Sequence, residues 1–293
     1  MTVTDMDGPR WSDFEENGFV VVRGLFSGAE IDELCAEFAV LHAAGPVPGH
    51  FEPRAAGATG AAGAAGAAGA AGAAGAAGAA GSGGPVDPLD AHPRVMHPHR
   101  INELSLRRLL DPRLRRILET LLGEEVLAAQ SMFYFKPPGA RGQALHQDNF
   151  YLRVEPGTCV AAWIACDAID RENGGLEVVP GTHRMDLFCP EEADAELSFV
   201  REYVPPPPGL AVVPVDMAPG DVLFFNGSLV HGSGPNRSAD RFRRSFIGHY
   251  VGRSTHRIGR HYPTLTMGGE PVALPESEGA GPCGTEFAPA APH

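Results

Sequence analysis

The second half of the sequence is a succession of short runs of strand-forming residues, each closed by residues that favour turns. Pro, Gly and Asn supply these turns, as in Pro137-Pro138-Gly139 and Asn173-Gly174-Gly175. The runs cover residues 125–130, 131–135, 144–152, 159–165, 175–179, 210–215, 221–225 and 244–251. Short strands in this arrangement are typical of a sandwich or barrel, and about eight of them make a jelly roll.

Helical periodicity occurs mainly before these strands. Apolar residues recur every three or four positions over 27–42 and over 104–122, and Asp111-Pro112 interrupts the second run. A further helix is expected over 11–18, with Ser12 and Glu15 as its capping box. We therefore expect a mainly β jelly roll with flanking helices packed on its outside. It would form a single domain over 1–293, with the jelly-roll core region and its preceding helices over 86–265.

Residues 57–84 form a low-complexity insert in which glycine recurs at every third position up to Gly81. Collagen has the same period, but it requires prolines, and the repeat contains none. Gly and Ala offer little side-chain surface to bury, and glycine loses much conformational freedom on ordering. We therefore expect a disordered surface insert, with an alanine-rich helix as the weaker alternative.

Replacing residues 57–84 with a short Gly-Ser linker is expected to leave the melting temperature and the activity nearly unchanged. The reason is that each doubling of a loop's length changes its closure free energy by only about 0.6 kcal/mol. Thermal unfolding and turnover of the two proteins check this expectation. A large fall in either quantity would show that the segment packs on the domain or controls access to its site.

Charge and cysteine content narrow the classes of partner. The 293-residue chain carries 36 acidic and 23 basic side chains, a formal net charge of −13, which disfavours nucleic acid. A local basic pocket can still bind an anionic small molecule. No apolar run reaches the ~18 residues of a membrane span, and the N-terminus lacks a signal core, so we expect no membrane partner. The five cysteines form no Cys-x-x-Cys pair, which favours free thiols and a cytoplasmic location.

Three metal-binding side chains stand at the ends of two strand-like runs. His146 and Asp148 are two residues apart, so they would point to the same side of a strand. His231 ends a later apolar run and adds a second imidazole. Two imidazoles and one carboxylate are the facial ligand set of non-haem Fe(II) oxygenases. Zn²⁺ can use the same ligands, and a second histidine pair, His97 and His99, lacks a neighbouring carboxylate.

Three arginines, Arg241, Arg243 and Arg244, follow His231 closely. Fe(II) that activates O2 requires a source of electrons, and a 2-oxoacid supplies two on decarboxylation. The far carboxylate of that acid requires a clamp, for which the planar guanidinium group is suited. The arginines therefore favour a 2-oxoglutarate pocket beside the metal, and a solvated basic surface is the alternative.

Six motifs occur in a fixed order along the chain. They are Phe-Lys-Pro-Pro-Gly (135–139), Leu-His-Gln-Asp (145–148), Trp-Ile-Ala-Cys-Asp (163–167), Glu-Asn-Gly-Gly-Leu-Glu-Val-Val-Pro-Gly-Thr-His (172–183), Pro-Gly-Asp-Val-Leu-Phe-Phe (219–225) and His-Gly-Ser-Gly-Pro-Asn (231–236). In these motifs the sequence resembles the phytanoyl-CoA dioxygenase family over nearly the whole chain except the insert and the C-terminal end. The resemblance implies a double-stranded β-helix, a cupin-like jelly roll.

The resemblance also implies roles for particular residues. The catalytic Fe(II) ligands would be His146, Asp148 and His231. The 2-oxoglutarate site would be lined by Met132, Trp163 and Ser233. Gln147 and Asn149 are candidates for substrate contacts, although a structural role is equally open for both.

The arginine that would bind 2-oxoglutarate does not fall at the spacing that is usual in the family. In the family it usually lies eleven residues after the distal histidine, and this chain has Phe242 there. One extra residue before that point would put Arg243 in the matching place. Arg241 and Arg244 are the alternatives.

The resemblance predicts an Fe(II)- and 2-oxoglutarate-dependent dioxygenase. It would use O2 to hydroxylate a small-molecule or acyl substrate, with release of succinate and CO2. Asp148 fills the position that related halogenases leave to chloride, which argues against halogenation. Desaturation, cyclisation and epimerisation stay open, and the sequence identifies neither the substrate nor the oligomeric state. The alternative is a non-redox, metal-binding cupin-like protein or a sensor of small acids.

Overall fold

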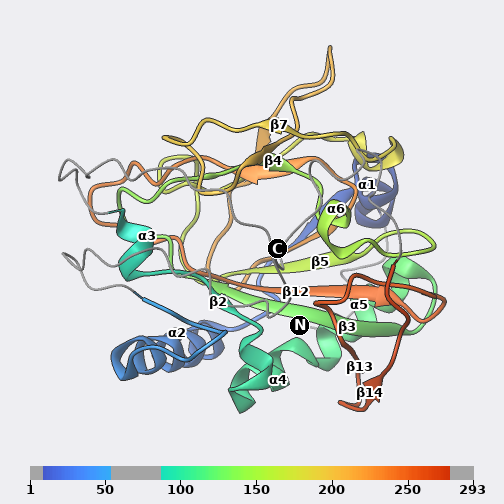
Figure 1. The fold of residues 1–293 in the computed structure, drawn as a ribbon, viewed down its shortest axis with the longest axis horizontal. Helices are drawn as coiled ribbons and strands as arrows, with labels where there is room; N and C mark the ends of the chain where they lie inside the picture. Colours follow the sequence, from blue (N-terminus) through green and yellow to red (C-terminus); the bar gives the residue numbers. More distant parts are fainter. Residues whose placement is uncertain (1–8, 54–86, 278–293) are drawn as a thin grey trace, which may run out of the picture.

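The computed structural model describes residues 9–53 and 87–277 (Figure 1). The predicted insert, residues 57–84, lies outside these ranges. The helices are α1 Pro9–Asn17, α2 Gly28–Ala44, α3 Pro88–Ala91, α4 Glu103–Leu109, α5 Pro112–Leu122 and α6 Asn149–Leu152, with 3₁₀ turns at Pro98–Arg100 and Thr182–Arg184. The strands are β1 Phe19–Val22, β2 Val95–Met96, β3 Val126–Tyr134, β4 Gln143–His146, β5 Val160–Ala165, β6 Leu176–Val178, β7 Glu191–Glu192, β8 Glu202–Tyr203, β9 Val213–Pro214, β10 Val222–Asn226, β11 His231–Ser233, β12 Ser245–Gly252, β13 Thr264–Thr266 and β14 Pro271–Val272.

Two antiparallel sheets make up the body of the protein. The larger sheet has eight strands in the order β1-β10-β5-β12-β3-β13-β14, and β2 also pairs with β3. The smaller sheet has the order β4-β11-β6-β9, and β7 pairs with β8 alone. This arrangement confirms the mainly β architecture with flanking helices. Sequential strands often lie in different sheets, as β3 and β4 do, which is the connectivity of a jelly roll.

The central strands β3, β5 and β12 of the larger sheet are buried on both faces, so their sequences do not alternate between apolar and polar residues. Most of their residues are apolar, and a few buried polar side chains such as Gln130 and His249 lie among them. One face packs against the helices: Phe38 of α2 stacks on Phe133 of β3 with ring centroids 3.8 Å apart. Figure 1 shows α2 and α4 on the side of this sheet away from β4, which confirms the predicted position of the helices. The other face, with Met132 and Trp163, forms a second core cluster with Leu176 of the smaller sheet.

Four local predictions are corrected by the structure. The runs predicted over 125–130 and 131–135 form one continuous strand, β3, and the run predicted over 144–152 is a strand only up to His146 and ends in helix α6. The helix predicted over 11–18 begins earlier, at Pro9, so Ser12 lies inside it and does not cap it. A complete capping box occurs instead at the start of α2, where Glu30 N donates to Ser27 Oγ and Ser27 N donates to the Glu30 carboxylate. The predicted strand over 210–215 is reduced to β9, because only Val213–Pro214 pairs with β6.

The structure also bears on the predictions about membrane spans and free cysteines. In the described ranges, no helix has the length and hydrophobicity needed to cross a bilayer. Cys35, Cys159 and Cys166 carry free thiols, as predicted. Cys189 is disulfide-bonded, so the prediction of free thiols throughout is wrong for that residue.

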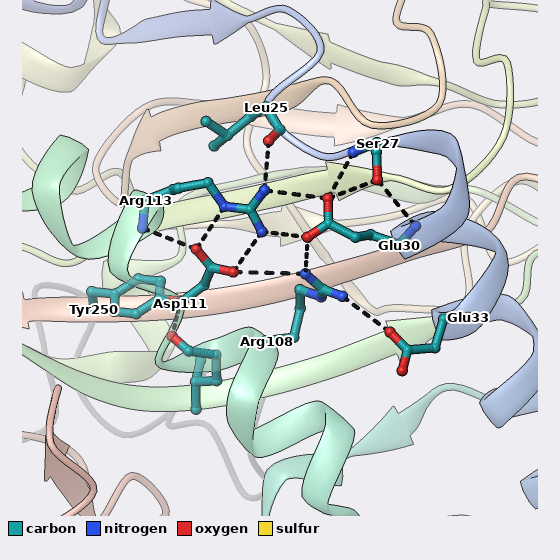
Figure 2. Close-up of polar contacts among 9 residues, drawn as sticks. Leu25, Ser27, Glu30, Glu33, Arg108, Asp111, Arg113 and Tyr250 are labelled. Atoms are coloured by element: carbon teal, nitrogen blue, oxygen red, sulfur yellow. Dashed lines mark hydrogen bonds and ion pairs between the residues drawn. The ribbon is translucent and has the colours of Figure 1, made fainter. Parts of the chain in front are cut away.

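An ionic cluster joins α2, α4 and α5 on the outside of the larger sheet (Figure 2). Arg113 Nη2 donates to Glu30 Oε1 at 2.6 Å and to Asp111 Oδ2 at 2.8 Å. Arg108, whose side chain is only 7% exposed, reaches the same Glu30 oxygen at 3.3 Å and lies over the Phe26 ring. Glu30 therefore both caps α2 and ties that helix to the α4–α5 pair.

Glu30→Gln is expected to lower the free energy of unfolding at neutral pH by about 1–2 kcal/mol, because a charge-assisted hydrogen bond is roughly twice as strong as a neutral one. The figure is kept small because the Glu30 side chain is 30% exposed and solvent screens it. The hydrogen bond from Arg113 holds the pKa of Glu30 well below its ordinary value of 4.5. The contribution is thus present above that ordinary value and is lost as the pH falls through the folded-state pKa.

Urea unfolding at neutral and at acidic pH measures this difference. The gap between wild type and Glu30→Gln should narrow as the pH falls below about 4. Glu33→Gln is the matched control, since Glu33 is more exposed and lies 3.8 Å from Arg108. Equal losses in the two variants would contradict a special role for Glu30.

Candidate metal centre

His146, Asp148 and His231 come together between the two sheets. Asp148 Oδ1 lies 3.5 Å from His146 Nε2 and 3.6 Å from His231 Nε2. One ligand atom of each residue lies within 4.8 Å of the others, and all three side chains are buried. Among the described residues this is the group of three His, Cys, Asp or Glu side chains that fits a metal ion. The donor set is the two imidazoles and one carboxylate predicted from the sequence.

Backbone carbonyls fix the orientation of both imidazoles. His146 Nδ1 lies 2.8 Å from the Ala144 carbonyl oxygen, and His231 Nδ1 lies 3.0 Å from that of Leu229. A carbonyl only accepts, so each Nδ1 carries the proton and each Nε2 presents a lone pair toward Asp148. Burial also lowers the pKa of His231 to about 4, so its imidazole is neutral at neutral pH. A neutral imidazole is the form that binds a metal.

The predicted reason for the convergence of His146 and Asp148 is wrong. Strand β4 ends at His146, and Asp148 has helical backbone angles (φ −59°, ψ −36°) at the start of α6. The chain turns after His146, so alternation along one strand does not apply. The second imidazole arrives through strand pairing: His231 is the register partner of His146 in the antiparallel β4–β11 pair, and the ring centroids are 4.3 Å apart.

His249 holds the other oxygen of the carboxylate. His249 Nε2 lies 2.9 Å from Asp148 Oδ2, and both side chains are buried. His249 comes from β12 of the larger sheet, so this hydrogen bond connects the centre to the opposite wall of the jelly roll. Oδ1 is thereby left to face the two imidazoles. The sequence does not predict this role for His249, because its position in an apolar run is also typical of a buried core histidine.

Arg243 enters the same cavity just before β12. Its side chain is 3% exposed, and the guanidinium lies 5.4 Å from the Trp163 ring centroid and 5.7 Å from that of Tyr134. It donates to Gly174 O and to Ser245 Oγ, and it forms no ion pair with a carboxylate in residues 9–53 and 87–277. Burial lowers the pKa of Arg243 to about 10, so the group stays cationic at neutral pH.

The two neighbouring arginines are neutralised by protein carboxylates instead. Arg241 pairs with Asp170 at 2.7 Å and with Glu172 at 2.7 Å. Arg244 makes a forked contact with Asp167, with a shortest distance of 2.6 Å. Neither lines the cavity around the metal-binding group, whereas Arg243 does.

Comparison with known proteins agrees with this geometry. The family model described as phytanoyl-CoA dioxygenase (PhyH) matches residues 14–245. The chain belongs to the phytanoyl-CoA dioxygenase family. Peroxisomal phytanoyl-CoA dioxygenase from Bos taurus is 33% identical over 158 residues, which is 50% of this chain and 46% of that protein. The Mus musculus enzyme is 28% identical over 249 residues, 81% of this chain and 66% of that protein. The chain thus spans about half the length of the first of these relatives.

Two solved structures carry the fold of this family member. The alpha ketoglutarate dependent carbocyclase SnoK from nogalamycin biosynthesis has a TM-score of 0.63 at 20% identity, covering 95% of this chain and 90% of its own. The epimerase SnoN, in complex with Fe3+, alpha ketoglutarate and nogalamycin RO, has a TM-score of 0.59 at 23% identity, covering 85% and 84%. At these identities the likeness shows the fold, and it confirms the predicted cupin-like jelly roll.

The remaining predicted residues of this phytanoyl-CoA dioxygenase family member fall into two groups. Met132, Trp163 and Ser233 line the cavity that holds the metal-binding group and Arg243. Gln147 and Asn149 do not line it. Gln147 Nε2 donates to Ser228 O and its Oε1 accepts from Phe188 N, while the Asn149 amide bridges Gly157 O and Val154 N. Their contacts therefore fit the structural alternative.

Lys136 is a buried residue that the sequence marked only as part of a motif. Its ammonium group donates to Gly174 O, Ser233 Oγ and Gly234 O at 2.6–3.0 Å. Burial, with the nearby Arg243 charge, lowers its pKa well below the ordinary value. Lys136 therefore fixes the loop after β11 next to the cavity.

Proposed function

We propose that the protein is a dioxygenase that uses Fe(II), 2-oxoglutarate and O2 to oxidise a small-molecule or acyl substrate, with release of succinate and CO2. The observation that carries the proposal is the pairing of a His-Asp-His group with Arg243 in one cavity. A cation that is buried without a protein carboxylate is costly, so a bound carboxylate from a ligand would stabilise it. A dicarboxylate that also reaches the metal meets both requirements.

The residues fit Fe(II) by the chemistry of their donors. The metal would be held by His146 Nε2, His231 Nε2 and Asp148 Oδ1, and a facial set of three leaves positions open for other ligands. When bound, Fe(II) supplies the electron transfer that couples O2 to decarboxylation and substrate oxidation. Arg243 would bind the far carboxylate of 2-oxoglutarate, with Ser233 close by. The aromatic and aliphatic walls from Trp163, Phe225 and Ile247 would exclude bulk water.

The alternative is a non-redox protein with zinc in the same three ligands. Anaerobic addition of 2-oxoglutarate to the Fe(II)-loaded protein should produce a weak visible charge-transfer band. Admission of O2 should then release CO2 and succinate. If the charge-transfer band is absent and no succinate forms at any iron loading, the zinc-binding alternative is supported instead.

His249 is expected to position the Asp148 carboxylate. His249→Phe should weaken Fe(II) binding by about 10- to 100-fold, which is the usual loss when a partner of a metal ligand is removed. His249→Gln, which keeps a donor, should recover part of that affinity. Titration of the apo-protein with Co(II), followed by its absorption, measures the affinity without any turnover. Unchanged Co(II) affinity and spectrum in His249→Phe would show that the hydrogen bond only stabilises the fold.

Two further predictions concern the domain organisation of the protein and its location in the cell. We place the catalytic unit in residues 86–265 of a single domain, since the metal ligands and Arg243 come from strands or connections of the two sheets there. The cytoplasmic location also stays a prediction. Fractionation of the native cells and limited proteolysis of the purified protein test these two points.

A further inference from the structure

A second pocket adjoins the metal cavity and shares Tyr134 with it. We call it the outer pocket. Its walls are mostly apolar, from Leu89, Pro93, Phe135 and Phe199, and one arginine, Arg94, faces into it. Apolar walls with a single placed charge are typical of a site that binds an organic molecule. None of the roles proposed above uses this pocket.

Strand pairing directs Arg94 toward the inside of the jelly roll. In the β2–β3 pair, Val95 is the partner of Phe133 and Met96 is the partner of Met132. Arg94, one residue earlier, therefore lies beside Tyr134, on the face shared by Met96 and Met132. Its Nη1 donates to Tyr134 OH at 3.2 Å, and its guanidinium lies 5.6 Å from the Phe199 ring centroid.

The positive charge of Arg94 can bind a ligand in the outer pocket. Arg94 is half-buried and forms no ion pair with a carboxylate in the part of the chain that the structure describes. The Lys136 ammonium group is directed to two carbonyls and Ser233. Burial and the neighbouring His42 lower the pKa of His92, so its imidazole is neutral at neutral pH. One positive charge among apolar walls matches a ligand with one negative charge.

A short chain of polar contacts leads from Arg94 to the metal-binding group. Tyr134 OH donates to Gln143 Oε1 at 3.4 Å, and Gln143 Nε2 lies 3.2 Å from His146 Nε2. Gln143 lines the metal cavity together with Tyr134. A molecule anchored at Arg94 would thus extend past Tyr134 toward the metal, as a substrate must.

We propose that the outer pocket binds the substrate, and that Arg94 selects a monoanionic carboxylate carried on an apolar body. This inference rests on the proposed function, because it places the far end of the molecule at the metal. Phe199 and Phe135 would cover the apolar part, and Arg94 with Tyr134 OH would bind the carboxylate. Such a charge-assisted contact is worth about 1.5–3 kcal/mol, which is about 10- to 150-fold in affinity.

The test measures binding without turnover, so it does not depend on the iron chemistry. The protein is loaded with Zn²⁺ and 2-oxoglutarate, and calorimetry measures the affinity for octanoate and 3-phenylpropionate and for their primary amides. Wild type should bind the carboxylates at least about tenfold more tightly than the amides. Arg94→Gln should reduce that ratio to about twofold or less.

Arg116→Gln is the matched control, because Arg116 is exposed on α5 and its loss changes the net charge equally. It should keep the full carboxylate preference. Equal binding of acids and amides by wild type overturns the proposal, and so does an absence of carboxylate binding up to about 10 mM. Octyl phosphate or octanoyl-CoA binding more tightly than octanoate, with the same dependence on Arg94, would overturn the carboxylate assignment in favour of a phosphate anion. The two proposals can fail separately. If the carboxylate preference is absent, succinate formation still tests the dioxygenase proposal, and if no succinate forms, the binding measurement with Zn²⁺ still tests the role of Arg94.

Discussion

His146→Ala and Asp148→Ala should each reduce Fe(II)-dependent decarboxylation of 2-oxoglutarate by more than about 100-fold, the upper loss seen when only a partner of a ligand is removed. Each change takes away one of three donors whose atoms meet around one point. The two remaining donors cannot hold the metal in a facial arrangement. Equilibrium dialysis of Fe(II), read by metal analysis, should show the loss of binding alongside the loss of succinate.

A control must show that the variants still fold. Both side chains are buried, so far-UV circular dichroism and the melting temperature must be measured on each variant. His256→Ala removes an exposed histidine and should change neither metal binding nor turnover. Asp148→Gly, assayed with added chloride, tests the role of Asp148 more directly than Asp148→Ala, because the small residue opens a position on the metal that a halide can fill. Recovery of 2-oxoglutarate decarboxylation in that variant would identify Asp148 as a metal ligand. Full activity in His146→Ala would exclude the His-Asp-His group as the metal centre.

The sequence allowed the ligand types to be predicted but not the way in which they meet. His146 and Asp148 were expected to share the face of one strand, yet the strand stops at His146 and Asp148 belongs to a helical turn. Side-chain periodicity describes a regular element only, and it fails where an element ends. The contact between His146 and His231 depends on the register of β4 with β11, which is a long-range property.

The residues that surround the metal ligands were harder to predict from the sequence than the ligands themselves. His249 and Tyr134 lie in apolar runs that resemble core strands, and nothing in their local spacing points to Asp148 or to Arg94. Helix positions were predicted better, because amphipathic spacing and the Asp111-Pro112 break are local signals. The structure accordingly contains α4 and α5 on either side of that break.

Strand alternation could not decide which arginine of the 241–244 stretch would clamp 2-oxoglutarate, because both faces of the following strand carry mixed residues. Burial and charge partners separate the three side chains. Arg241 and Arg244 each have a protein carboxylate within 2.7 Å, so their charges are already compensated. Arg243 is buried in the metal cavity, and among the described residues it makes hydrogen bonds only to neutral groups.

Arg243→Ala is therefore expected to raise the KM for 2-oxoglutarate well over tenfold while Fe(II) still binds. Loss of one partner of a buried charge pair costs about 2–5 kcal/mol. Arg243→Lys should recover only part of the affinity, because an ammonium group keeps the charge but lacks the planar fork that binds a carboxylate at two points. Initial rates of succinate formation against 2-oxoglutarate concentration, with Fe(II) affinity measured separately, distinguish this effect from damage to the metal centre.

Arg241→Ala and Arg244→Ala are the controls in the same stretch, and each should change the KM only a few fold. Arg244→Ala should act on stability instead, since it leaves the largely buried Asp167 carboxylate without its guanidinium partner. Because these variants remove the same charge within two residues of Arg243, a general electrostatic effect would raise the KM similarly in all three. A large effect confined to Arg241→Ala or Arg244→Ala would move the clamp to that residue and leave the dioxygenase proposal standing. A large effect confined to Arg243→Ala, with Fe(II) affinity unchanged, would support a direct contact between Arg243 and the bound carboxylate.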